Sequence, residues 1–405
     1  MQFEKSTMIT EDDILLMHDA MLLAQRGEGL VNPNPLVGAL IVKDDEVVAR
    51  GWHTRYGDLH AEREAFRDAE ERKVDCKGAT MYVTLEPCCH QGHQPPCTDA
   101  IIEHGVKRVV VGLLDPNPLV AGKGVALLRE AGIDVGVLED VIFENEVVAQ
   151  SAMALVSELK IQNRVFRKYI TTNMPWVTAK WAMTLDGKIA TTTGDSKWIT
   201  SEKARERVHL MRKNNMAILC GIGTVMADDP MLNVRLSEQR MEQLGIKEHE
   251  VRQPIRIVAD RQARLPLESQ LVSTAHEIPL IVVYGNSADE EKLQQLRDAG
   301  VTLWNCNTLT ELIQRAGAEK IDSIMLESGG TLSEALLKEE LIDEVVAFVA
   351  PKIVGGKGAK TPVEGDGVSM MGEAIELTNQ IVETIGPDVM ISGLVKKLST
   401  NSSFS

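Results

Sequence analysis

The stretch His60-Ala61-Glu62, followed by Pro87-Cys88 and then by Cys97, decides how the first half of this chain is interpreted. One imidazole and two thiolates suit tetrahedral Zn²⁺ and leave the fourth coordination position open for water. An open position distinguishes a catalytic zinc site from a structural one, because bound zinc lowers the pKa of water toward about 7. The sequence therefore predicts a catalytic zinc held by His60, Cys88 and Cys97.

Glu62 is the predicted proton carrier of this site. Residues two apart do not share a face within a regular helix, so His60 and Glu62 converge only if they lie at a helix N-terminus. The sequence agrees, because Gly57-Asp58 precedes them and good helix formers begin at Ala61. The order of these residues resembles the H-x-E and P-C signature of zinc-dependent nucleobase deaminases.

The residues around the ligand cysteines offer competing donors. Cys89 adjoins Cys88 and is expected to point elsewhere, whereas His90 and His93 are alternative ligands. The alternative to a metal site is a scattered histidine with two core cysteines. The ordered set, with a glutamate at the right offset, favours the metal site.

Outward from this motif, hydrophobic periodicity predicts alternating helices and strands in the first half. Thr10 and Asp13 form a capping-box-like start for a helix that ends at Gly27. The expected strands are 36–42, 47–50, 79–85, 106–112 and 133–138, and the further helices are 61–70 and 123–131. This alternation predicts an α/β sandwich with helices on the sheet.

A second α/β pattern occupies the rest of the chain. Residues 140–160 are expected to be helical, 160–169 to form a polar, basic connection, and 237–253 to be a surface insertion. The expected strands are 176–181, 216–221, 255–259, 280–284, 323–327 and 344–350, and a helix is expected at 202–213. We therefore expect a first domain at 1–150, a connecting helix and linker at 151–173, a second domain at 174–398 and a flexible tail at 399–405.

Composition narrows the class of protein. A chain of 405 residues with 44% hydrophobic and 25% charged residues suits two or three globular domains. The net charge is −16, of which −12 lies in the first 150 residues, and this argues against nucleic acid as a partner. Neither a signal peptide nor a membrane span is apparent, so we expect a cytoplasmic protein without membrane contact. The six cysteines are expected to be reduced thiols or metal ligands.

The second half carries glycine-rich turns, none of which is decisive alone. Gly221-Ile222-Gly223 follows a strand but lacks the third glycine of a dinucleotide fingerprint. Both Gly355-Gly356-Lys357-Gly358 and Asp228-Asp229-Pro230 are consistent with ordinary turns. Glu327-Ser328-Gly329-Gly330 joins a strand to a helix that begins at Thr331, which suits pyrophosphate binding or ordinary core geometry.

Taken together, these motifs resemble the bifunctional deaminase–reductase family of riboflavin biosynthesis. The nine-residue spacing from Cys88 to Cys97, with Pro95-Pro96 before the second ligand, is similar to that family's motif. Further matching blocks are Pro33–Gly38, Gly51–His53, Asp115–Pro118, Gly122–Gly124, Lys180–Ala190, Ser196–Thr200, His209–Arg212, Gly221–Pro230, Leu232–Arg235, Glu327 with Gly329-Gly330, and Pro351-Lys352 with Gly355-Gly356. The resemblance covers residues 11–394 in the family's order.

The resemblance implies a cytidine-deaminase-like α/β/α sandwich followed by a dihydrofolate-reductase-like α/β domain, with zinc and NADPH as cofactors. It implies hydrolytic deamination of 2,5-diamino-6-(5-phosphoribosylamino)pyrimidin-4(3H)-one, with Glu62 passing a proton to the departing amine. It further implies NADPH reduction of the ribosyl side chain of 5-amino-6-(5-phosphoribosylamino)uracil to ribityl. The expected partners are this small phosphorylated pyrimidine and further copies of the chain, in a homodimer or a higher homo-oligomer.

Site residues follow from the same resemblance. The implied substrate-binding residues are Asn34, His53, Ser196, Arg212, Leu232, Arg235 and Glu327. The implied cofactor-binding residues are Met183, Trp198, Thr224, Asp228, Gly329, Gly330 and Thr331. Lys180 is a possible catalytic residue of the reduction, although no residue is assigned as its proton donor.

Four positions depart from the family pattern. Cys89 stands where serine is usual, His93 stands where a basic phosphate-binding residue is usual, and Gln94 stands where threonine is usual. An imidazole is only partly charged near pH 7, so we expect weaker or pH-dependent phosphate binding in the first half. Arg261 stands where serine is common, and is either an exposed surface residue or a contact to the 2′-phosphate of the cofactor.

Three other functions remain as alternatives. The first is a deaminase whose second domain is catalytically inactive. The second is an editing deaminase acting on tRNA, which the acidic first half and the nine-residue cysteine spacing disfavour. The third is a zinc-stabilised binding module, which would need neither Glu62 nor an open coordination position.

Overall fold

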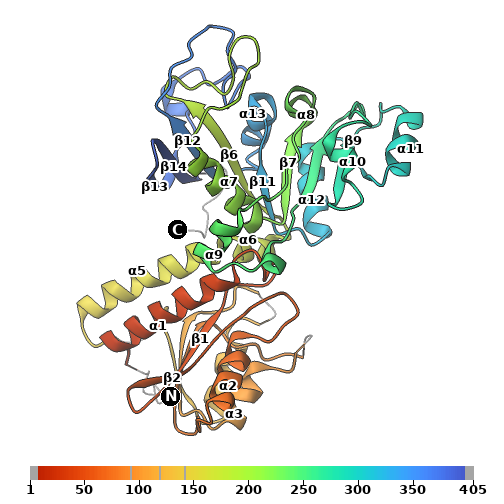
Figure 1. The fold of residues 1–405 in the computed structure, drawn as a ribbon. Coiled ribbons are helices and arrows are strands. Elements are labelled where there is room, and N and C mark those ends of the chain that lie inside the picture. Colours follow the sequence, from red (N-terminus) through yellow and green to blue (C-terminus); the bar gives the residue numbers. More distant parts are fainter. Residues whose placement is uncertain (1–7, 92–93, 118–119, 141–142, 397–405) are drawn as a thin grey trace. The chain divides into compact units, whose positions relative to one another are not determined.

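The computed structural model describes residues 8–91, 94–117, 120–140 and 143–396, and these form two compact units (Figure 1). The first unit ends at Asn173 and the second begins at Met174. The segment 151–173, expected to connect two domains, therefore falls within the first unit. No helix in the described ranges is both long and apolar enough to cross a bilayer.

The first unit is built on a five-stranded sheet in the order β2-β1-β3-β4-β5. β1 pairs antiparallel with β2 and β3, whereas β4 pairs parallel with β3 and β5. The strands are β1 (Gly38–Lys43), β2 (Glu46–Trp52), β3 (Thr80–Leu85), β4 (Arg108–Leu113) and β5 (Asp134–Val137). The helices are α1 (Glu11–Ala24), η1 (Gln25–Gly27), α2 (Ala61–Glu71), α3 (Cys97–Glu103), α4 (Lys123–Glu130), α5 (Glu146–Gln162) and α6 (Arg164–Thr172).

Alternate residues of these strands face two separate cores, because successive side chains of a strand point to opposite faces. Ile41 of β1 packs in the core that contains Phe66 of α2, whereas Leu40 packs in the core that contains Met17 of α1. Figure 1 shows α1 and α5 side by side, with α2 and α3 on the other side of the sheet. This three-layer arrangement confirms the predicted α/β/α sandwich.

The second unit is built on a nine-stranded sheet in the order β10-β9-β8-β7-β11-β6-β12-β14-β13, which is parallel except where β14 pairs with β12 and β13. The strands are β6 (Trp176–Thr184), β7 (Ala217–Gly221), β8 (Ile255–Ala259), β9 (Leu280–Tyr284), β10 (Thr302–Asn305), β11 (Ser323–Leu326), β12 (Glu344–Ala350), β13 (Leu377–Ile385) and β14 (Asp388–Val395). The helices are α7 (Glu202–Asn214), α8 (Ile222–Asp228), α9 (Glu238–Leu244), η2 (Glu248–Glu250), α10 (Gln270–Ser273), α11 (Glu290–Asp298), α12 (Leu309–Ala318), α13 (Gly330–Lys338) and η3 (Met371–Glu373).

Both faces of the parallel part of this sheet are buried, which explains the continuous apolar runs of its strands. Ile257 of β8 packs in a core with Leu312 of α12, whereas the next residue, Val258, packs in a core with Leu296 of α11. The sequence therefore yields the predicted second α/β unit.

The structure differs in detail from the sequence prediction in the segments 140–160 and 160–169. The helix expected from residue 140 begins at Glu146, because Asn145 caps it by accepting hydrogen bonds from the backbone N–H groups of Val147 and Val148. The basic stretch expected as a connection is largely helical, as part of α6. The insertion at 237–253 contains the short helices α9 and η2, which bury none of their residues and so have no apolar face that the sequence could reveal.

Candidate active sites

Three potential metal ligands from three segments converge in the first unit. His60 precedes α2, Cys88 lies in the loop after β3, and Cys97 is the first residue of α3. Nδ1 of His60 lies 3.4 Å from each of the two sulfur atoms, and all three ligand atoms lie within 4.8 Å of one another. Ligands of a tetrahedral zinc, with Zn–S of about 2.3 Å and Zn–N of about 2.1 Å, are themselves about 3.6 Å apart. The donor set therefore fits zinc.

Cys88 is held by the first turn of α3. Its carbonyl oxygen accepts hydrogen bonds from the backbone N–H groups of Cys97 and Thr98, at 3.0 and 3.2 Å. The Cys97 N–H also lies 3.3 Å from the Cys88 sulfur. The Cys97 thiol, and then His60, lower the pKa of Cys88 to about 4. Cys88 thus favours the thiolate form, which is the form that binds metals.

Glu62 lies in the first turn of α2 with only 3% of its surface exposed. The backbone of His60 is extended, with φ −73° and ψ 162°, so the chain is still turning into the helix between the two residues. This is the geometry that the sequence requires for them to share a site. Burial, and then the negative charge of Cys88, raise the pKa of Glu62 to about 7. A carboxyl group with such a pKa can both accept and donate protons near neutral pH.

Asn34 and His53, the two implied substrate contacts of this unit, lie beside the potential metal ligand His60. Nδ2 of Asn34 lies 3.1 Å from Nε2 of His53, whose Nδ1 lies 3.0 Å from the carbonyl oxygen of Leu59. The imidazole rings of His53 and His60 meet edge to face, with centroids 5.5 Å apart. Burial lowers the pKa of His53, so its ring is held neutral, with Nδ1 as donor to Leu59 and Nε2 as acceptor from Asn34.

Arg63 and Glu86, to which the sequence assigned no role, support this site. Arg63 donates hydrogen bonds to the carbonyl oxygens of Pro95 and Pro96, at 3.2 and 2.8 Å, and so ties the loop before Cys97 to α2. The buried carboxylate of Glu86 accepts backbone N–H hydrogen bonds of 2.9–3.1 Å from three residues, Asp115, Gly122 and Val125. The position of Glu86 directly before Pro87-Cys88 was the available signal.

Cys89, His90 and His93 are the other possible metal donors near Cys88. Cys89 and His90 do not belong to the group of metal-ligating side chains found within the described ranges. His93 lies outside the described residues. All six cysteines are free thiols, as expected for a chain without disulfides.

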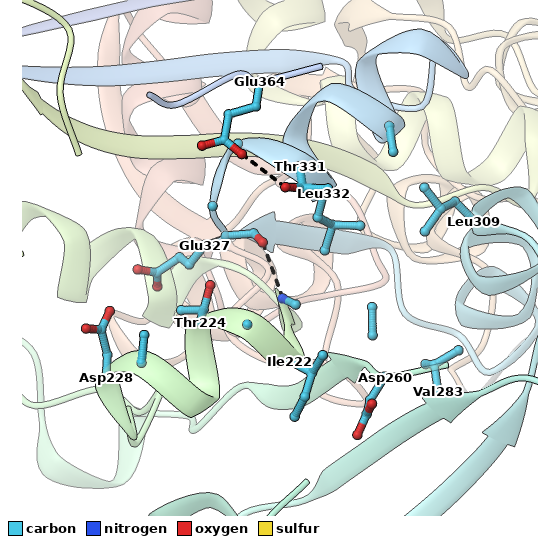
Figure 2. Close-up of a pocket in the computed structure, with 18 of the residues that line it drawn as sticks. Ile222, Thr224, Asp228, Asp260, Val283, Leu309, Glu327, Thr331, Leu332 and Glu364 are labelled. Carbon is cyan, nitrogen blue, oxygen red and sulfur yellow. Dashed lines mark hydrogen bonds between the residues drawn. The ribbon is translucent and has the colours of Figure 1, made fainter. Parts of the chain in front are cut away.

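The second unit contains a cavity of about 1190 Å³ along the carboxyl ends of its parallel strands. Figure 2 shows Glu327, Thr224 and Asp228 toward one end, and Asp260, Val283 and Leu309 toward the other. The carboxyl edge of a parallel sheet is the usual place for a ligand in α/β proteins.

A buried carboxylate organises one end of this cavity. Glu327 accepts two hydrogen bonds from the guanidinium of Arg212, at 2.6 and 3.1 Å, and lies 2.7 Å from Nζ of Lys180. Burial alone would raise the pKa of Glu327, but these two cations hold it far below its ordinary value. Glu327 therefore stays ionised between the two basic side chains.

The structure brings most, but not all, of the implied reductase residues together. The cavity is lined by Lys180, Ser196, Arg212, Thr224, Asp228, Leu232, Glu327, Gly329, Gly330 and Thr331. The Ser196 hydroxyl donates to Asp228 at 3.1 Å. Three implied residues, Met183, Trp198 and Arg235, are not among the lining residues, and the Trp198 side chain is exposed with the guanidinium of Arg205 stacked on its ring.

His209 is a further residue near this site that received no role from the sequence. Its Nδ1 accepts the backbone N–H of Arg235 at 3.2 Å. Burial, followed by the charges of Arg212 and Arg235, lowers the pKa of His209 to about 4. A neutral imidazole can accept this hydrogen bond at physiological pH, so His209 fixes the backbone of Arg235.

Two family models together match most of the chain. The cytidine and deoxycytidylate deaminase zinc-binding region matches residues 10–113, and the RibD C-terminal domain matches residues 175–391. The chain is 43% identical over 392 residues to the riboflavin biosynthesis protein RibD of Actinobacillus pleuropneumoniae, which covers 95% of this chain and 96% of that protein. It is 39% identical to RibD of Escherichia coli, over 94% of this chain and 98% of that protein.

Solved structures agree with these relatives. Acinetobacter baumannii RibD superposes with a TM-score of 0.81 at 36% identity, covering 96% of this chain and 99% of that chain. A diaminohydroxyphosphoribosylaminopyrimidine deaminase/5-amino-6-(5-phosphoribosylamino)uracil reductase from Thermotoga maritima superposes with a TM-score of 0.77 at 34% identity, covering 95% and 99%. The chain belongs to the RibD family, the bifunctional deaminases and reductases of riboflavin biosynthesis.

Proposed function

We propose that the first unit removes the 2-amino group of 2,5-diamino-6-(5-phosphoribosylamino)pyrimidin-4(3H)-one, and that the second unit uses NADPH to reduce the ribosyl group of the deaminated product to ribityl. Two observations support the proposal. In the first unit, Glu62 lies beside three side chains that could hold a metal. In the second unit, Lys180 and Arg212 both contact Glu327.

In the first unit, His60, Cys88 and Cys97 would hold zinc, which when bound supplies the activation of a water molecule at neutral pH. Glu62 accepts a proton from the attacking water and delivers it to the amino group, which leaves as ammonia. Asn34 and His53 orient the pyrimidine ring beside these groups.

In the second unit the protein would orient the ribosyl group against NADPH, which when bound would supply a hydride for C1′. Glu327 holds Lys180 and Arg212 in place, so that their N–H groups face the ribose and its phosphate. Ser196, Leu232 and Arg235 would complete the substrate contacts, and Met183, Trp198, Thr224, Asp228 and the turn Gly329-Gly330-Thr331 would contact the cofactor.

One incubation tests both steps. Zinc-loaded protein is mixed with the diaminopyrimidine substrate and NADPH, and ammonia release and nicotinamide absorbance are followed together. We expect both signals. Glu62→Ala should abolish both, and a substrate that has already been deaminated should restore NADPH oxidation.

The alternatives give different results in this assay. Ammonia release without NADPH oxidation would support a deaminase with an inactive second domain. The absence of both signals, with zinc bound, would contradict the assigned substrate.

We also propose that the chain acts in the cytoplasm as a homo-oligomer. Sedimentation of the purified protein would test the oligomeric state.

A further inference from the structure

The loop before β1 carries Asn34 and has few backbone donors of its own. Asn34 lies between Pro33 and Pro35, and a proline has no backbone N–H. On one side the loop is fixed because the Asn34 N–H donates to the carbonyl oxygen of Val31 at 2.8 Å. On the other side the next residue with both an N–H and a carbonyl group is Leu36. What holds Leu36 therefore helps to place Asn34.

Leu36 is held by Asn163, from a distant part of the sequence. Oδ1 of Asn163 accepts the Leu36 N–H at 2.8 Å, and Nδ2 of Asn163 donates to the Leu36 carbonyl oxygen at 2.9 Å. A carboxamide offers the same donor and acceptor as a peptide group, so one side chain satisfies both backbone groups of Leu36. The two residues are 127 positions apart, and the pairing is therefore a tertiary contact.

The Asn163 side chain is not used to cap a helix. Asn163 lies between α5 and α6, and asparagine is a common N-cap residue, yet its side chain makes no capping hydrogen bond to α6. Its backbone N–H instead donates to Leu159 at 3.1 Å, and its carbonyl oxygen accepts the N–H of Arg167 at 2.9 Å. Leu159 and Phe166 anchor the junction in the core shared with α1. The carboxamide, only 2% exposed, is thus left to hold Leu36.

Both implied substrate contacts of the first unit adjoin Leu36. Asn34 precedes it by two residues, and Nδ2 of Asn34 lies 3.1 Å from Nε2 of His53. Val37 directly follows it, and the Val37 carbonyl oxygen accepts the backbone N–H of His53 at 3.0 Å. A displacement of Leu36 would therefore reach Asn34 through the chain and His53 through this backbone hydrogen bond.

We propose that Asn163 is a positioning residue of the deamination, which fixes Leu36 and thereby holds Asn34 against His53 where the pyrimidine ring binds. The inference rests on the proposed function of the first unit. The segment 151–173, predicted from the sequence to connect two domains, thereby contributes to the first site. Small shifts matter there, because a displacement of about 1 Å in a positioned group can lower a rate by about 10²-fold.

The test is steady-state ammonia release by the zinc-loaded full chain. Asn163→Ala should raise the KM for the diaminopyrimidine substrate about 10-fold, which corresponds to the loss of about one well-placed hydrogen bond, and should change kcat by less. Zinc content should not change. NADPH oxidation of a deaminated substrate by the second unit of the same preparation should also stay at the wild-type rate. An unchanged KM would overturn the proposal.

A double-mutant cycle separates positioning from a general structural role. If Asn163 acts through Asn34, Asn163→Ala should lower kcat/KM in the wild type but add little in the background of Asn34→Ala, because the two losses share one cause. A role in stability alone would lower kcat/KM by the same factor in both backgrounds. That outcome would refute the positioning role.

Asn145→Ala is the matched control. Asn145 caps the other end of α5 by accepting the backbone N–H groups of Val147 and Val148. Its removal should lower the melting temperature of the first unit and leave the KM unchanged. An equal rise of KM in Asn145→Ala and Asn163→Ala would show that helix stability, and not the contact to Leu36, sets the KM.

Asn163→Asp decides the question if Asn163→Ala does not fold or retains no zinc. A carboxyl group fills the same space and can make the same two hydrogen bonds when protonated, but can only accept when ionised. The KM of this variant relative to that of the wild type should therefore fall as the pH is lowered from about 8 to about 5.5, since burial favours the neutral form. A ratio that is independent of pH would count against the proposal.

Hydrogen exchange of the Leu36 backbone amide tests the contact without turnover. Exchange should be faster in Asn163→Ala than in the wild type, because the N–H loses its acceptor. If the wild type releases no ammonia, the assigned deamination fails, whatever the exchange shows. If the wild type releases ammonia and Asn163→Ala does so with an unchanged KM, the deamination stands and only the positioning role fails.

Discussion

At the scale of single residues, the two sites use buried carboxylates in opposite ways. In the described part of the chain no ion pair joins Glu62 to a lysine or arginine, and burial raises its pKa to about 7. Glu327 is also largely buried, but it lies against Arg212 and Lys180, which keep it ionised. The first arrangement suits a residue that moves a proton, and the second suits one that positions other groups.

Glu62→Gln should lower the rate of ammonia release by a factor of about 10²–10⁴, because the amide cannot shuttle a proton. Zinc content should not change, since Glu62 is not among the three grouped ligands. The measurement is ammonia release alongside metal analysis of the same preparation. The exposed Glu71→Gln, on the same helix, is the control. Loss of zinc together with activity would show that Glu62 supports the metal instead.

At the scale of helices and strands, close packing positions the potential metal ligand His60 and the neighbouring Glu62. A Cβ atom added at Gly51 of β2 would collide with backbone atoms of Ala61 and Ala65 in α2. The absence of a side chain at this position thus allows α2 to lie directly on the strand, and α2 carries Glu62 and follows His60.

Gly51→Val should therefore displace α2 and weaken zinc binding and deamination together. Overpacking of this kind costs about 1–3 kcal/mol, which lowers the melting temperature of a unit of this size by about 5 °C. Calorimetry and zinc titration test this. Gly372→Ala, where an added Cβ meets nothing, is the control. Full zinc affinity in Gly51→Val would contradict the packing argument.

A buried ionic network joins α1 to two strands of the first unit. Asp13 of α1 accepts hydrogen bonds from Tyr82 of β3 and from Arg108 of β4, each at 2.7 Å. Burial alone would raise the pKa of Asp13, but Arg108 and the Thr10 backbone hold it below its ordinary value of 3.8. Because the folded-state pKa is lowered, the stabilisation is present above about pH 4 and is lost as pH falls through the folded pKa.

Asp13→Asn should lower the stability of the first unit by about 2–4 kcal/mol at pH 7, since it removes the short ion pair of Arg108 and leaves that cation, within the described ranges, only a long ion pair to Asp134, at 3.9 Å. The loss should shrink as the pH falls below about 4, because the unfolded chain takes up a proton on Asp13 there before the folded protein does. Thermal unfolding at several pH values measures this, with the exposed Asp12→Asn as the control. A difference that is constant from pH 3 to pH 7 would refute the ionic explanation.

At the scale of the whole molecule, the two activities belong to units with separate hydrophobic cores. The three potential metal ligands found in the described ranges lie in the first unit, and the Glu327 cluster lies in the second. We therefore expect the reduction not to require the metal.

Removal of zinc by a chelator should abolish ammonia release and leave NADPH oxidation of a deaminated substrate intact. The melting transition of the first unit should shift down, because bound metal contributes to folding stability, whereas the second transition should not move. Added zinc should restore both losses. If chelation also stopped the reduction, the two units would have to be coupled.

The sequence by itself predicted the alternation of helices and strands, the group of His60, Cys88 and Cys97 that could hold a metal, and the place of Glu62 at a helix start. These features depend on local periodicity and on donors whose chemistry is specific. Only the tertiary structure decided that Arg212 and Lys180 meet on Glu327, that His209 supports Arg235, and that Arg261 lines the same cavity as Glu327. The order of strands in a parallel sheet differs from their order in the chain, so contacts across strand ends have no signature in the sequence.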